Sequence, residues 1–73
     1  MNNLMPLPEA YQGLNAAQAI AQAFFNRTNE WLDAGHPLDA LNTYITRFTL
    51  AETVGDKRVI LREITTYLIR NRK

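Results

Sequence analysis

The fold is decided by residues 15–37, which read NAAQAIAQAFFNRTNEWLDAGHP. Side chains suited to an interior recur here in steps of four, three, four and three, at Ala17, Ala21, Phe24, Thr28 and Trp31, and a second row widens this stripe at Ile20, Phe25 and Leu32. This period is typical of one face of an amphipathic helix. Gly35 can adopt the left-handed conformation that closes a helix, and Pro37 prevents simple continuation. We predict a helix over 15–34 with neighbours on two sides.

The predicted start of this helix depends on a capping pattern. Asn15 is a suitable N-cap, and Gln18 follows three residues later, as in a capping box. Pro6 and Pro8 disfavour helix in the residues before them. Residues 1–14 are therefore predicted to form an extended N-terminal arm, which either docks on the helices or remains a disordered tail.

Two further helices are predicted after the turn at residues 35–37. Residues 37–49 place one apolar row on a single face, with members Leu38, Leu41, Ile45 and Phe48. Residues 56–71 do the same with Ile60, Leu61, Ile64, Tyr67 and Leu68. The fold class that follows is all-α, a three-helix bundle in one domain over 15–73.

The start of the third helix has two alternatives. Thr49 and Glu52 form a second capping-box pattern, so a helix could begin there. Residues 53–57 could instead be a tight hairpin between β-branched strands. Alternation over residues 58–69 is poor, because it places Arg62 and Ile60 on one face, and a helix is the better interpretation.

Size and cysteine content bear on how such a domain is stabilised. A chain of 73 residues has room for one small core, and a core of this size supplies about 3–5 kcal/mol. Cysteine is absent, so disulfides are excluded. Good helix packing or a second subunit remains, and we expect a homodimer.

Charge divides the chain into two parts. Residues 1–53 carry two cationic and five acidic side chains, which gives a net charge of −3. Residues 54–73 carry six cationic and two acidic side chains, which gives a net charge of +4. Parts of opposite sign favour contact with each other or with a second copy. The cationic part contains a basic stripe at a helical spacing, at Arg58, Arg62, Thr66, Arg70 and Lys73. It is interpreted either as a surface for phosphates or an acidic protein, or as a solvated helix face.

An enzymatic function is not expected. The chain has neither cysteine nor serine, its single histidine has no evident partner, and its three glycines are isolated. Asp33, His36 and Asp39 recur every three residues, but Gly35 and Pro37 interrupt the helix that would align them, so no metal site is predicted. We expect no cofactor.

Two features bear on partners. A DNA-binding helix-turn-helix across residues 35–37 is disfavoured, because its second helix would bring Asp39 to the phosphates. Aromatic residues concentrate binding energy in interfaces. The partner-binding hypothesis therefore names Phe24, Phe25, Trp31 and Leu32. Phe24 and Phe25 are adjacent and cannot point the same way, so at least one should lie at the margin of the core.

In outline the chain is similar to many short helical regulators of bacteria and phages, although no motif in it identifies a family. The function expected is that of a non-enzymatic regulator or adaptor acting by protein–protein interaction. The alternative is a nucleic-acid-binding transcriptional regulator that uses the basic third helix. The N-terminus has no basic n-region followed by a continuous apolar run, so a cytoplasmic location away from membranes is expected.

Overall fold

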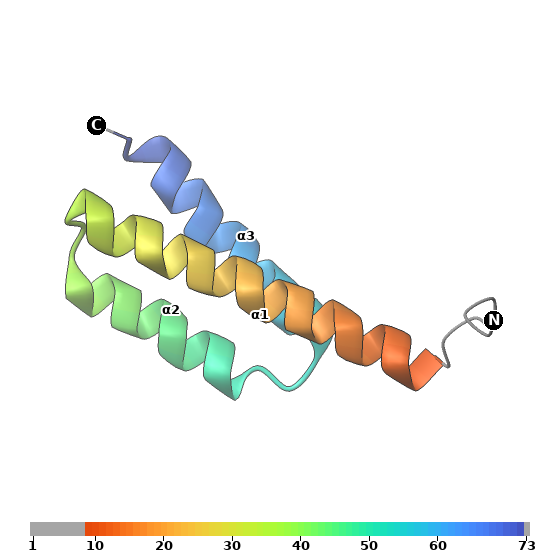
Figure 1. Ribbon diagram of the computed structural model, residues 1–73. Helices are drawn as coiled ribbons and strands as arrows, with labels where there is room; N and C mark the ends of the chain where they lie inside the picture. The colour runs from red at the N-terminus through yellow and green to blue at the C-terminus, as the bar shows by residue number, and fades with distance from the viewer. Residues whose placement is uncertain (1–8, 73) are drawn as a thin grey trace, which may run out of the picture.

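The chain folds into three helices. The computed structural model describes residues 9–72, and the side chains of residues 15–72. Helix α1 spans Glu9–Ala34, α2 spans Leu38–Leu50 and α3 spans Val54–Arg70. In Figure 1, α2 runs antiparallel to α1, and α3 lies behind α1 at an angle to it. Residues 9–72 contain no strand, so the all-α three-helix prediction is confirmed and the hairpin alternative at residues 53–57 is wrong.

Helix α1 begins at Glu9 and not at Asn15. The predicted capping box at Asn15 and Gln18 is therefore wrong, because the helix continues N-terminally past both residues and through Gly13. A capping pattern is a local preference worth about 1 kcal/mol, and here good helix formers precede it. Residues 1–8 of the predicted extended arm lie outside the described residues, and residues 9–14 are helical.

The turn between α1 and α2 closes as predicted. Gly35 has a φ of 73°, its N–H donates to the Leu32 carbonyl at 3.1 Å, and the His36 N–H donates to the Trp31 carbonyl at 3.2 Å. These two bonds form a Schellman motif, which satisfies carbonyls that the helix end would leave without partners. Helix α2 begins one residue after Pro37, which makes no side-chain cap.

The turn between α2 and α3 differs from the prediction. Thr49 lies inside α2, where its Oγ1 donates to the Ile45 carbonyl at 2.8 Å, so the proposed capping box at Thr49 is wrong. Helix α3 begins two residues earlier than predicted, at Val54. Its N-cap is Thr53, whose Oγ1 accepts a hydrogen bond from the Asp56 N–H at 3.0 Å. A threonine followed three residues later by an acidic residue occurs twice within residues 49–56, and only the second of these threonines caps a helix.

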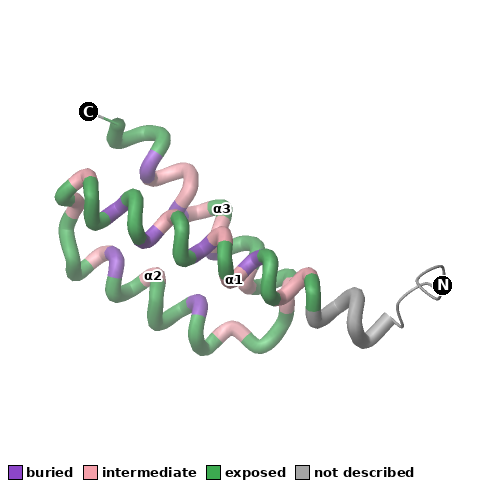
Figure 2. Tube along the Cα trace, in the orientation of Figure 1, coloured by how far each residue is buried: buried purple, intermediate pink, exposed green. Residues whose placement is uncertain are grey.

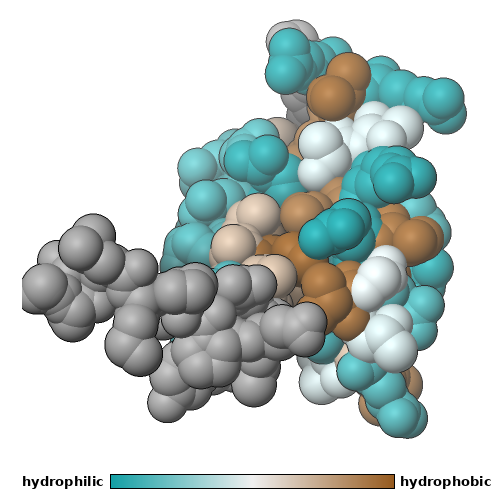
Figure 3. Space-filling model, turned by 90° about the vertical axis from the view of Figure 1, so that its right-hand side faces the viewer, coloured by the Kyte–Doolittle hydropathy of each residue, from teal (hydrophilic) through white to brown (hydrophobic). Residues whose placement is uncertain are grey.

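The core lies between the facing sides of the three helices, where Figure 2 shows the buried residues in purple. Helix α1 makes most of its contacts with α3 and few with α2. The Phe24 and Phe48 rings stack with centroids 4.1 Å apart, and Trp31 and Ile64 are fully buried. Lys57 covers one end of the core, since its Nζ donates to the Phe48 carbonyl at 2.7 Å and lies 4.5 Å from the Phe48 ring centroid. Hydrophobic residues also reach the surface at the end where α3 begins (Figure 3).

Candidate interaction surfaces

The four residues of the partner-binding hypothesis separate into two pairs. Phe24 and Trp31 are 5% and 0% exposed and belong to the core. Phe25 and Leu32 are 64% and 53% exposed. The expectation that one of the two adjacent phenylalanines lies outside the core is therefore confirmed, and only Phe25 and Leu32 are accessible to a partner.

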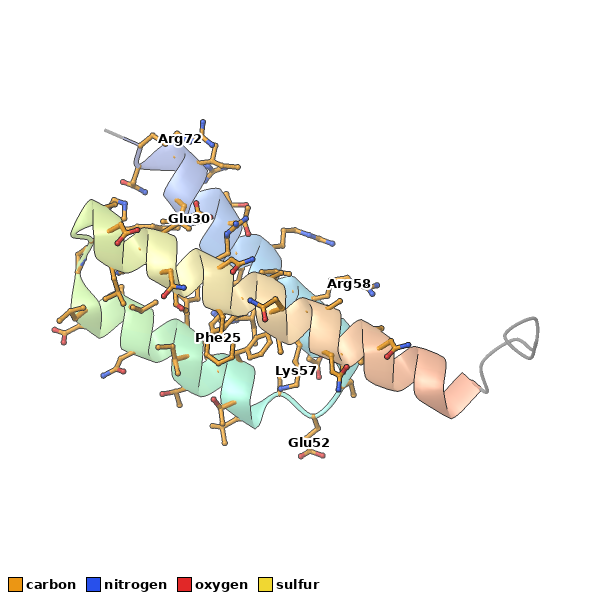
Figure 4. The ribbon with its side chains drawn as sticks, in the orientation of Figure 1. Phe25, Glu30, Glu52, Lys57, Arg58 and Arg72 are labelled. Carbon is orange, nitrogen blue, oxygen red and sulfur yellow. The ribbon has the colours of Figure 1, made fainter. Side chains whose placement is uncertain are left out.

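Phe25 and Leu32 lie on the α2 side of α1. On the opposite flank, Arg27 and Ala34 line a groove shared with α3. Phe25 precedes Arg27 by two residues, and Leu32 precedes Ala34 by two. Two residues turn an α-helix by about 200°, so Phe25 and Leu32 point away from that groove. Figure 4 accordingly places Phe25 between α1 and α2.

Helix α2 presents apolar side chains on the corresponding flank. Its other flank faces α3, where Arg47 pairs with Glu63. Ile45 precedes Arg47 by two residues and therefore lies on the opposite flank, 38% exposed, and Leu38 lies one heptad before Ile45, 64% exposed. Four accessible apolar side chains thus come together along two antiparallel helices. We call this surface the α1–α2 face, with members Phe25, Leu32, Leu38 and Ile45.

The exposed residues around the α1–α2 face carry little charge. Between residues 15 and 29, every exposed side chain of α1 is uncharged: Asn15, Gln18, Ala19, Gln22, Phe25, Asn26 and Asn29. On α2 the only charged side chains among the exposed ones are Asp39 and Arg47. Depletion of charge around exposed apolar residues is what distinguishes the centre of an interface from ordinary protein surface.

Charge is concentrated instead on α3. Of the predicted basic stripe, Arg58, Arg62 and Arg70 are exposed, and Lys73 lies outside the described residues. Figure 4 shows Arg58 projecting away from the three helices. The ion pairs found among the side chains of residues 15–72 are Arg27 with Glu30 and Arg47 with Glu63, so none of the three stripe arginines has an acidic partner among them.

A groove of about 400 Å³ runs between α2 and α3, beside the stripe. Its lining residues are Tyr44, Arg62, Glu63, Thr66, Tyr67, Arg70 and Asn71. Glu63 is occupied by Arg47, which donates to its two carboxylate oxygens at 2.7 and 3.1 Å. These hydrogen bonds, more than the accompanying charge attraction, lower the pKa of Glu63. Arg62 and Arg70 therefore face a groove whose one acid is already paired.

A second groove, of about 540 Å³, separates the C-terminal ends of α1 and α3. It contains side chains of both signs, among them Arg27, Glu30, Asp33 and Arg72. His36 also lines it, whereas Asp39 does not, so the Asp33, His36 and Asp39 series is not assembled. Over the described part of the chain, no three His, Asp or Glu side chains group closely enough to hold a metal ion.

Sequence reasoning missed two sets of residues. Leu38 and Ile45 share the apolar row of α2 with Leu41, yet the structure leaves both accessible because α1 and α2 make few contacts. Tyr44 and Tyr67, which line the α2–α3 groove, were not proposed as site residues. No sequence signal distinguishes them from ordinary core aromatics.

No protein-family model matches the chain, and the comparisons with curated proteins and with solved structures find no significant similarity. None of the helices within residues 9–72 combines the length and the hydropathy that crossing a bilayer requires.

Proposed function

We propose that the protein is a small non-enzymatic helical regulator or adaptor that acts by protein–protein interaction, and that a second copy docks on its α1–α2 face to form a homodimer. The observation that carries the proposal is the uncharged, apolar character of this face. Phe25 and Leu32 on one helix, and Leu38 and Ile45 on the other, are exposed on the flanks where the two helices run next to each other. Contiguous exposed apolar side chains rimmed by uncharged polar ones favour a macromolecular contact.

A second copy suits this face on grounds of charge. In a twofold dimer the same surface meets itself, so a face of one sign would repel its partner. The α1–α2 face avoids that cost because the exposed side chains of α1 from residue 15 to residue 29 are uncharged. The charged residues Arg27, Glu30 and Asp33 line the groove between α1 and α3 instead. Pairing through α3 would instead oppose Arg58, Arg62 and Arg70 of the two copies.

The size of the face is also adequate. At 1.5 Å per residue, residues 15–34 of α1 extend for about 30 Å and the 13 residues of α2 for about 20 Å, and each helix is about 10 Å wide. The resulting area of roughly 500 Å² per copy gives the total of about 1,000 Å² that the smaller specific interfaces bury. A dimer of this kind leaves both α3 helices on the outside, available to a target.

Sedimentation velocity at micromolar concentrations tests the proposal. A dimeric wild-type protein, with a thermal midpoint that rises with concentration, is the expected result, because mass action stabilises an associated folded state. A monomer that melts cooperatively and independently of concentration would overturn it.

A further inference from the structure

We propose that the α2–α3 groove, together with Arg58, is a binding site for single-stranded nucleic acid, in which arginines contact phosphates and tyrosine rings contact bases. This inference concerns the other flank of α2 from the one that contributes to the α1–α2 face. It does not depend on the proposed dimer.

The first supporting observation is the inventory of cations. Arg27 and Arg47 are neutralised by carboxylates, and Lys57 is committed to the Phe48 carbonyl and ring. The remaining cations among residues 15–72 are Arg58, Arg62, Arg70 and Arg72, which have no acidic partner among those residues and are all exposed. Three of these four lie on α3. Arginine has a planar fork of donors that matches phosphate oxygens and can also stack on rings, so its use here favours a phosphate ligand.

The second observation is the arrangement of these arginines along the groove. Arg62 and Arg70 line the same groove, and eight residues separate them, which corresponds to about 12 Å along the helix axis. Arg58 extends the line one turn further toward the start of α3, by about 6 Å. The cations therefore form a track of about 18 Å along one helix, as expected for an extended polyanion and not for a single small anion.

The third observation is the pair of tyrosines in the groove. Tyr44 and Tyr67 line it and are half-buried, and both rings pack on Trp31, with centroids 5.8 and 4.3 Å from it. Buttressing by a fully buried tryptophan fixes the two rings in place. Rigid aromatic rings beside a cationic track are the features with which proteins bind unpaired bases by stacking.

Duplex DNA fits the groove less well. A duplex keeps its bases stacked inside the helix, so it would leave the two tyrosine rings unused, and residues 54–70 contain neither Asn nor Gln with which to read adenine edges. An acidic protein segment would satisfy the arginines but would make no use of the tyrosine rings. Single-stranded nucleic acid uses both groups, so it is the ligand to which the proposal commits.

Fluorescence anisotropy with a labelled oligothymidylate of about 20 nucleotides tests the wild-type protein first. Binding at about 50 mM salt, at least tenfold weaker at about 200 mM, is expected for several phosphate contacts. Affinity for the matched duplex should be lower. Absence of binding at low salt, preference for the duplex, or equally tight binding of polyglutamate would each overturn the proposal.

Two pairs of variants then locate the site. Arg62→Gln/Arg70→Gln should lose about tenfold in affinity and reduce the salt slope by about 1.4, since each phosphate contact to a single strand contributes about 0.7. The matched control, Arg27→Gln/Arg72→Gln, removes the same charge from the other groove and should stay within about twofold. Equal losses in both pairs would mean that only net charge matters, and would overturn the site.

The tyrosine contribution is tested by Tyr44→Leu against Tyr44→Phe, with circular dichroism melts to verify folding. Tyr44→Phe keeps the ring and should retain affinity, whereas Tyr44→Leu should lose roughly fivefold or more. Equal affinities of Tyr44→Leu and Tyr44→Phe would show that stacking on this ring does not contribute to binding.

Discussion

The indole Nε1 of Trp31 donates a hydrogen bond to the Pro37 carbonyl at 2.8 Å, so the largest core side chain also fixes the turn between α1 and α2. Trp31 is fully buried. Its ring stacks on Tyr67 of α3 and meets Tyr44 of α2 edge-on. One residue of α1 therefore connects all three helices, which explains how a small core can hold them together although α1 and α2 make few direct contacts.

Trp31→Phe tests this role. The substitution keeps an aromatic ring but removes both the donor to Pro37 and part of the buried volume. The free energy of unfolding should fall by about 2–3 kcal/mol in urea titrations followed by circular dichroism. That is much of what a core of this size supplies. The control Leu50→Ala, at a position 72% exposed and outside the α1–α2 face, should change it by less than about 0.5 kcal/mol, and a similarly small loss for Trp31→Phe would contradict the role.

Two glycines should respond in opposite directions to the same substitution. Gly35→Ala should destabilise by about 1 kcal/mol because the φ of 73° disfavours a Cβ, although nothing lies within 4 Å of that atom. Gly55→Ala should stabilise by up to about 0.5–1 kcal/mol, since Gly55 is in the first turn of α3 and its Cβ would meet only Thr53 Oγ1, at 3.9 Å. Thermal melts of the two variants show whether each substitution raises or lowers the stability. Destabilisation by Gly55→Ala would contradict the open space around this Cβ position.

Thr53 and Thr49 distinguish the cap that is used from the cap that is not. Thr53→Ala removes the acceptor for the Asp56 N–H and should cost about 1 kcal/mol. Thr49→Ala removes only a hydroxyl that bonds back to the Ile45 carbonyl inside α2, and should be neutral or slightly stabilising. Urea titrations of both variants should give a lower free energy of unfolding for Thr53→Ala than for Thr49→Ala, and the reverse order would contradict the assignment of the cap.

The Arg47–Glu63 pair predicts a pH dependence. Because the folded state lowers the pKa of Glu63 from its usual 4.5, the pair stabilises the fold at neutral pH. This contribution is lost as the pH falls below 4.5 through the lowered pKa. The raised pKa of Arg47 keeps the guanidinium charged throughout. The thermal midpoint of Glu63→Gln should lie below that of the wild type at neutral pH, and the difference should close in acid.

Glu52→Gln is the control for this pair, because Glu52 is exposed and forms no ion pair with the described residues. Its midpoint should follow that of the wild type at each pH. A gap between the wild type and Glu63→Gln that persists at the lowest pH would show that the carboxylate charge is not what matters. Both side chains are largely exposed, so the effect is expected to be small.

The parts of the fold that could be predicted are those with strong periodicity. Trp31 and Phe24 lie where the stripe of steps three and four placed them, and Gly35 closes α1 because a left-handed residue was needed there. The starts of α1 and α3 could not be predicted. Asn15 and Thr49 have sound capping sequences, but a cap is a weak local preference, and the helices continue past both positions.

Less of the candidate surfaces could be predicted. The exposure of Phe25 follows from its adjacency to Phe24, and the exposure of the stripe arginines follows from their spacing. Leu38 and Ile45 could not be placed at the surface, because the periodicity of α2 does not show how far apart α1 and α2 lie. The α2–α3 groove depends equally on packing, since Tyr44 and Arg62 meet there from different helices.

Sedimentation velocity of two single variants tests most directly whether a second copy docks on the α1–α2 face. Phe25→Glu places a charge in that face, where a twofold axis would oppose it with its own copy. Leu50→Glu is the matched control, because Leu50 is 72% exposed on the side of α2 away from Leu41 and the α1–α2 face. The account predicts a monomer for Phe25→Glu and a dimer for Leu50→Glu, with both proteins folded by circular dichroism. A Phe25→Glu protein that remains dimeric would contradict it.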